Sequence, residues 1–100
     1  MTDWLISVPA WGERCLSALE SYVVPAIKEA VNGIDGKVCF VVHTDQPFRV
    51  DGMLGSFERS IRPVPEGSNA WVKAGAANRE AAALARTGEA VAFIHADMVP

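Results

Sequence analysis

The chain has 100 residues, of which 50% are hydrophobic, and a formal net charge of −3. This hydrophobic content excludes a disordered chain, and the length allows one domain or part of one. The acidic balance predicts no nucleic-acid partner, and no apolar run nears the roughly 20 residues that span a bilayer, so no transmembrane segment is expected. We treat residues 1–100 as a single, incomplete domain.

Two features favour a cytoplasmic setting. The first residues lack the basic and apolar regions of a signal peptide. Cys15 and Cys39 are far apart and lie among apolar residues, so we interpret them as small buried hydrophobic side chains rather than as a disulfide framework.

The first half of the chain predicts strand, helix and strand. Residues 4–8 are apolar and end at Pro9, which cannot donate a backbone hydrogen bond. Apolar residues then recur at helical spacing from Glu13 to residues 32–33, and Pro25 predicts a kink or a break within that helix. Residues 37–43 form an unbroken β-branched and aromatic run, which predicts a central parallel strand.

The second half continues the alternation. Asp51 is expected to cap a short helix, and residues 60–64 to form a strand that Pro63 confines to the sheet edge. A second long helix is predicted from residue 70 to about residue 87, with Gly88 ending it. Residues 90–94 then form an apolar strand, expected to be buried on both faces. The fold class is therefore α/β, with a mostly parallel sheet of three or four strands flanked by helices.

Polar or aromatic side chains follow three of these strands, and parallel strands bring them to one edge of the sheet. Trp11 could stack on a base or sugar, or could simply cover the core. Asp45 could accept hydrogen bonds from a base or ribose, or could form a turn. His95 and Asp97 share the last strand tip, where Asp97 could hold a divalent cation.

Four further polar residues have simpler interpretations. Lys73 and Arg79 either face a phosphate or only solvate a helix. His43 is expected to be a structural histidine whose hydrogen bonds are satisfied, and Glu80 is expected to lie on the surface.

The segment of residues 75–97, an Ala-, Asn- and Arg-rich helix followed by Thr-Gly, an apolar strand and His95-Ala-Asp97, resembles the signature of family 2 glycosyltransferases. These enzymes have the GT-A fold, a Rossmann-like α/β fold, and their strand closes with Asp-x-Asp. The strand that ends in Val8-Pro9 and the strand that leads to Asp45 resemble the family as well. The resemblance covers nearly the whole chain, but only the N-terminal, nucleotide-sugar-binding half of such an enzyme.

This resemblance implies roles for particular residues. Pro9, Ala10 and Trp11 would border the nucleotide, and Asp45 would contact the base. Asn78 or Arg79 would lie near the diphosphate-sugar, and Asp97 with His95 would bind Mn²⁺ or Mg²⁺. These residues are as follows: Pro9, Ala10, Trp11, Asp45, Asn78, Arg79, His95 and Asp97.

Two departures from the family pattern matter. His95 replaces the first acid of Asp-x-Asp, which disfavours Mg²⁺ because this ion prefers oxygen ligands. The family's order Arg-Asn is reversed in Asn78-Arg79, which turns each side chain by about 100° around the helix.

The sequence therefore predicts the donor-binding part of a glycosyltransferase whose substrate is a nucleotide-diphosphate sugar. The acceptor region and catalytic base of the family lie beyond Pro100, so we expect no sugar transfer by this chain alone. A non-catalytic binding or interaction module with the same fold is the alternative that His95 favours. A nucleotidyltransferase is a weaker alternative. It would need a glycine-rich, basic loop after the first strand, and residues 9–14 contain only one glycine and one arginine. An uncovered sheet edge could also lead to self-association.

Overall fold

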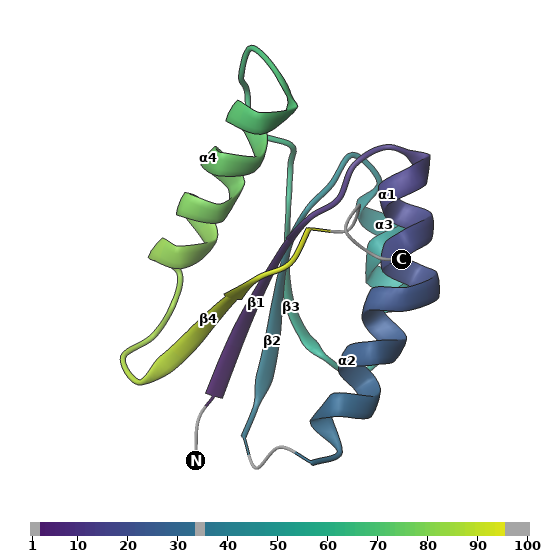
Figure 1. Cartoon of the computed structure of the whole chain (residues 1–100), viewed down its shortest axis with the longest axis vertical. Helices are drawn as coiled ribbons and strands as arrows, with labels where there is room; N and C mark the ends of the chain where they lie inside the picture. Colours follow the sequence, from purple (N-terminus) through teal and green to yellow (C-terminus); the bar gives the residue numbers. More distant parts are fainter. Residues whose placement is uncertain (1–2, 34–35, 96–100) are drawn as a thin grey trace.

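The structure, a computed structural model, describes residues 3–33 and 36–95 (Figure 1). Within these ranges four parallel strands form one sheet in the order β3-β2-β1-β4. The strands are β1 (Asp3–Pro9), β2 (Val38–His43), β3 (Glu58–Arg62) and β4 (Glu89–Phe93). The predicted α/β class and parallel sheet are confirmed, and β2 is an inner strand as expected.

Helices cover both faces of the sheet (Figure 1). One face carries α1 (Glu13–Ala18), the π-helical turn η1 (Leu19–Val23), α2 (Val24–Val31) and α3 (Pro47–Met53). The other face carries α4 (Ala70–Ala83). The chain moves outward from β1 to β3 and then returns past β1 to β4, which is compatible with a Rossmann-like, doubly wound arrangement.

Two hydrophobic clusters hold these layers together because strand side chains alternate between the faces. The larger cluster lies under α1, α2 and α3 and includes Leu16, Phe40 and Val42. The smaller one joins Leu5 and Val41 to Ala81 of α4. No helix of the described residues is long and apolar enough to cross a membrane.

The predicted interruption of the first helix takes the form of the π-helical turn η1. Pro25 has no N–H group to bond the carbonyl four residues earlier, so a regular α-helix cannot run through it. The wider π turn precedes it, and Pro25 then occupies the first turn of α2. Helix α2 continues directly from η1, so the π turn accommodates the N–H that Pro25 lacks within one continuous helical run.

The boundaries of the helices correct two predictions. Helix α3 begins at Pro47, so Asp51 lies inside it and does not cap it. Helix α4 ends at Ala83, and Gly88 lies in the next turn with φ 86°, where the N–H of Glu89 bonds the carbonyl of Arg86. Gly88 therefore shapes the turn into β4 and does not end the helix.

Burial corrects two further predictions. Strand β4 is an edge strand whose residues are half-buried or, at Phe93, exposed, so it is not buried on both faces. Among the described residues, β1 is the one strand that pairs with it. Cys15 and Cys39 are half-buried rather than fully buried, and burial raises the pKa of the Cys39 thiol.

Candidate functional site

The carboxyl ends of the strands are joined into one rim by backbone hydrogen bonds that continue past the strands. Ala10 donates its N–H to the carbonyl of His43 at 2.8 Å, and Thr44 donates to the carbonyl of Arg62 at 2.9 Å. Ala10 and Thr44 are themselves buried, so Ala10 presents backbone rather than side chain to this rim. The loops that follow β1 and β2 are thus held side by side.

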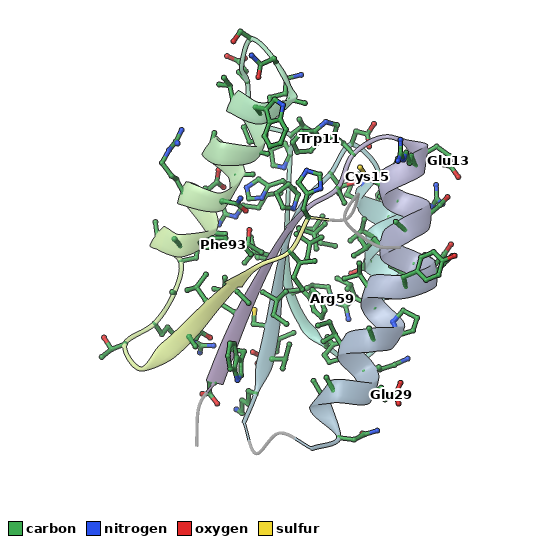
Figure 2. The ribbon with its side chains drawn as sticks, viewed as in Figure 1. Trp11, Glu13, Cys15, Glu29, Arg59 and Phe93 are labelled. Carbon is green, nitrogen blue, oxygen red and sulfur yellow. The ribbon has the colours of Figure 1, made fainter. Side chains whose placement is uncertain are left out.

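A pocket of about 240 Å³ lies on this rim between the ends of β1 and β4. Strand order reverses between these two strands, and open α/β sheets bind ligands in the crevice at that point. Figure 2 shows Trp11 and Cys15 at this end of the sheet, where α1 begins. The residues that line the pocket come from the ends of β1 and β4 and from the starts of α1 and α4: Pro9, Trp11, Cys15, Ala70, Ala74 and His95.

Three residues singled out in the sequence therefore meet in this pocket, namely Pro9, Trp11 and His95. Trp11 is half-buried and His95 is exposed. The ring of Trp71, which is 81% exposed, lies with its centroid 6.3 Å from that of His95. The pocket thus combines aromatic surface with an imidazole.

The start of α4 closes the pocket, and a side-chain cap fixes where that helix begins. Asn69 accepts a hydrogen bond from the N–H of Val72 at 3.0 Å through Oδ1. This cap satisfies one of the backbone donors that a helix leaves unpaired at its start. Ala70 and Ala74 follow it on the pocket side, and their small side chains leave the space open.

Asp45 lies beside the pocket rather than in it. Its Oδ1 is 3.5 Å from the N–H of Gly12, the residue before α1, whose φ of 84° suits glycine. Asp45 also borders a second hollow of about 470 Å³ with Thr44, Arg62 and neighbouring residues of the β3 tip. The carboxylate is exposed and ties the loop after β2 to the start of α1.

An ion pair reinforces the same helix start. Arg49 of α3 lies 2.5 Å from Glu13 of α1, and Ser17 donates to the same carboxylate at 3.1 Å. The hydrogen bonds from Arg49 and Ser17 hold the pKa of Glu13 below its ordinary value of 4.5. The pKa of Arg49 is raised by the same contact.

Asn78 and Arg79 point in different directions from α4. Asn78 accepts a hydrogen bond from the buried hydroxyl of Ser7 at 2.9 Å, which fastens α4 to β1. Arg79 is exposed, and a Cβ atom at Gly75 would lie 3.4 Å from its Nη1. The guanidinium therefore extends back toward the start of α4, one turn from the pocket residue Ala74.

His43 departs from the predicted structural histidine. Its side chain is fully buried, and neither ring nitrogen has a hydrogen-bond partner among the described residues. Its Nε2 lies 3.5 Å from Oε2 of Glu80, but not in hydrogen-bonding geometry. Glu80 is exposed, as predicted, and its carboxylate pairs with Arg62 at 2.9 Å.

The described residues do not by themselves form a metal site. They contain no group of three or more histidine, cysteine, aspartate or glutamate side chains able to hold an ion. His95 supplies one donor, while Asp97 lies outside the described residues. The metal site at His95 and Asp97 therefore stays a prediction.

Sequence reasoning missed the contributions of the two helix starts to the pocket. Cys15 is the third residue of α1, and Ala70 and Ala74 occupy the first turns of α4. Their closeness to the strand ends was a usable signal, since helices of this fold begin where the preceding loops leave the sheet. The pairing of Ser7 with Asn78, 71 residues apart, had no local signal.

Comparison with family models, with curated proteins and with solved structures finds no match to this chain. Inference about function therefore depends on the residues of the site.

Proposed function

We propose that this chain binds a nucleotide-diphosphate sugar and forms the donor-binding part of a family 2, GT-A glycosyltransferase. One observation carries the proposal: Trp11 and His95 line a pocket at the point where the strand order reverses. Ligands of open α/β sheets bind at this position, and nucleotides are the common class. The resemblance of residues 75–97 to the family signature narrows the class to nucleotide sugars.

The proposed roles follow from the positions of the side chains. Trp11 offers a ring for stacking against the base or sugar. Asp45, exposed beside Gly12, offers a carboxylate to N–H or hydroxyl donors of the nucleoside. Arg79, which extends toward the start of α4, would approach the diphosphate, while Asn78 would act indirectly because Ser7 already occupies its Oδ1.

A divalent metal is a separate part of the proposal. His95 and Asp97 would contact Mn²⁺ more readily than Mg²⁺, because an imidazole is among the donors. Such an ion would offset the negative charge of the diphosphate.

Calorimetric titration with UDP, GDP and their sugar conjugates, with and without Mn²⁺, tests the proposal. We expect saturable binding of one nucleotide, weakened by Trp11→Ala about tenfold or more, since loss of one stacking contact costs roughly 1–3 kcal/mol. Trp4→Phe is the matched control, because Trp4 lies at the opposite end of β1. A folded sample that binds none of these nucleotides would rule the proposal out.

The metal is tested by the same titrations in EDTA and with Asp97→Ala. If nucleotide binding is unchanged in EDTA and in Asp97→Ala, the metal role is excluded, while the proposal of nucleotide binding still holds. The non-catalytic module is the second candidate, because His95 stands where the family has a carboxylate. That candidate is favoured if the chain binds no nucleotide.

A further inference from the structure

The two edges of the sheet carry different protection against pairing with another strand. At one edge, β3 has the sequence Glu-Arg-Ser-Ile-Arg, in which three of five residues are charged. At the other edge, β4 has the sequence Glu-Ala-Val-Ala-Phe, in which only Glu89 is charged. Natural sheets place charges, prolines or bulges on edges that stay unpaired. The β4 edge therefore has the character of a strand that is paired.

The backbone of β4 presents free hydrogen-bonding groups on its outer side. Ile94 donates its N–H to the carbonyl of Ser7 in β1 at 2.9 Å. Backbone groups alternate in direction along a strand, so those of Val91 and Phe93 point away from β1. Among residues 3–33 and 36–95, no strand pairs with this side of β4, as its outer position in Figure 1 illustrates.

Apolar surface adjoins this edge on both faces of the sheet. Phe93 is 55% exposed (Figure 2). On the opposite face, Ala92 and Ile94 line a hollow of about 180 Å³ that continues onto Trp4 and Ile27. A strand added to β4 would shield both surfaces.

We propose that the β4 edge pairs antiparallel with the β4 edge of a second copy of this chain, which gives a continuous eight-stranded sheet. The two-fold axis passes between the two Ala92 residues. This register puts Val91 opposite Phe93, whose outward backbone groups can then exchange hydrogen bonds. It also puts Ala90 opposite Ile94, so apolar side chains face apolar side chains on both faces.

The charges of the strand suit this self-pairing. Glu89 is the one charged residue of β4, and the register places it at the end of the pair, opposite His95 of the other copy. Like charges, which destabilise directly opposed pairs, therefore do not meet. Antiparallel pairing of two β3 strands would place arginine opposite arginine or glutamate opposite glutamate in several registers. The isologous contact also closes, so it yields a dimer and no open chain of copies.

Sedimentation velocity over a concentration series tests association of the full chain. We expect the apparent mass to rise from 10.7 kDa toward twice that value as concentration increases. Phe93→Lys should raise the dimer dissociation constant at least about tenfold, because a charge enters the edge. Phe48→Lys is the matched control, since Phe48 is 93% exposed and lies on α3, away from β4.

Disulfide trapping tests the register, in a chain that also carries Cys15→Ser and Cys39→Ser. Ala92→Cys should crosslink two copies on mild oxidation, because residues in a non-hydrogen-bonded antiparallel pair have Cα atoms about 4.5 Å apart, within disulfide reach. Ala90→Cys should not, since its equivalent in the other copy is four residues along the strand. Far-UV circular dichroism checks that each variant is folded.

Three results would overturn the proposal. One is a wild-type chain that remains a monomer at all concentrations, which would assign the edge to a different occupant. Another is crosslinking of Ala90→Cys as readily as Ala92→Cys. A third is dissociation caused by Phe48→Lys and not by Phe93→Lys. None of these measurements requires a nucleotide, so they stand apart from the proposed function.

Discussion

The side chain of His43 is polar but lies in a fully buried position. An imidazole that is fully buried with neither nitrogen hydrogen-bonded loses its hydration without compensation. The nearby carboxylate of Glu80 is 42% exposed and already pairs with Arg62, so it compensates little. His43 therefore lowers the stability of the folded chain.

Replacing His43 by leucine should therefore stabilise the chain. We expect His43→Leu to raise the free energy of unfolding by about 1 kcal/mol, because an apolar side chain of similar size removes two unsatisfied polar atoms. Urea denaturation measures the change. His43→Gln, which keeps a polar side chain, should bring no gain; a loss of stability in His43→Leu would contradict this account.

Glu13 and Arg49 give the chain a defined dependence of stability on pH. The pKa of Glu13 is held below 4.5 in the folded chain by its hydrogen bonds to Arg49 and Ser17. A lowered carboxyl pKa stabilises the fold above the unfolded value, and this contribution disappears as the pH falls through the folded value. The pair is exposed, so its effect is small and weakened by salt.

Thermal unfolding of wild type and Glu13→Gln between neutral and acidic pH should show this. The wild type is expected to be slightly more stable at neutral pH, and the two curves should converge as the pH falls below 4.5. Glu20→Gln is the control, because Glu20 lies 3.9 Å from the same arginine. A difference that persists at low pH would show that the carboxylate charge is not its cause.

Local patterns predicted the site only in part. Pro9, Trp11 and His95 could be placed at one edge because each follows a strand whose apolar run is plain in the sequence. The contacts between α4 and the sheet could not be predicted, because they depend on how the helix is rotated over the strands. That rotation brings Asn78 to Ser7 and Glu80 to Arg62, and no spacing along the chain encodes it.

Among the elements, the strands were more predictable than the helix ends. The apolar runs that form β1 and β2 are plain in the sequence, so their positions followed. The β-branched and aromatic run of β2 also predicted its inner location. The start of α3 differs from the prediction because Pro47, and not a residue next to Asp51, begins this helix, and proline suits the first residue of a helix. The end of α4 was predicted too late, because the helix-favouring residues Leu84 and Ala85 follow its last residue, Ala83.

The π turn η1 gives a prediction about the helical run from α1 to α2. Pro25→Ala restores an N–H that can bond the carbonyl of Ser21, so the regular helix can continue. We expect the free energy of unfolding to rise by about 1 kcal/mol, less than the roughly 3 kcal/mol that separates proline from alanine inside a regular helix. Chemical denaturation gives the value, and hydrogen exchange at residue 25 reports the new bond.

Pro47→Ala is the control for this change. Pro47 is the first residue of α3, where the backbone N–H has no helical partner, so no gain is expected. An equal gain at both positions would mean that the π turn does not result from Pro25.

At the scale of the whole molecule, the sheet order determines which parts open first. Strands β1 and β2 have neighbours on both sides, whereas β3 and β4 have one neighbour each within the described residues. Inner strands should therefore open only with global unfolding, and edge strands by local opening. Trp11 and His95, which follow an inner and an edge strand, belong to parts of unequal stability.

Hydrogen exchange should reveal this order. In dilute solution we expect slow exchange along β1 and β2, and an alternating pattern in β4. The amide of Ile94, bonded to Ser7, should be protected, while those of Val91 and Phe93 should exchange fast. Mass spectrometry with short peptides, or NMR, resolves the residues. Uniform protection along β4 under monomeric conditions would contradict the outward direction of these groups.

The three tryptophans of the chain have three different surroundings. Trp4 packs against the core at the amino end of β1, Trp11 lines the pocket at its carboxyl end, and Trp71 stands in the open beside His95. A single-tryptophan variant that keeps Trp11 or Trp71 would make the emission of the unlabelled chain an optical report on the pocket. Occupancy of the pocket by a ligand could then be followed in solution and in real time.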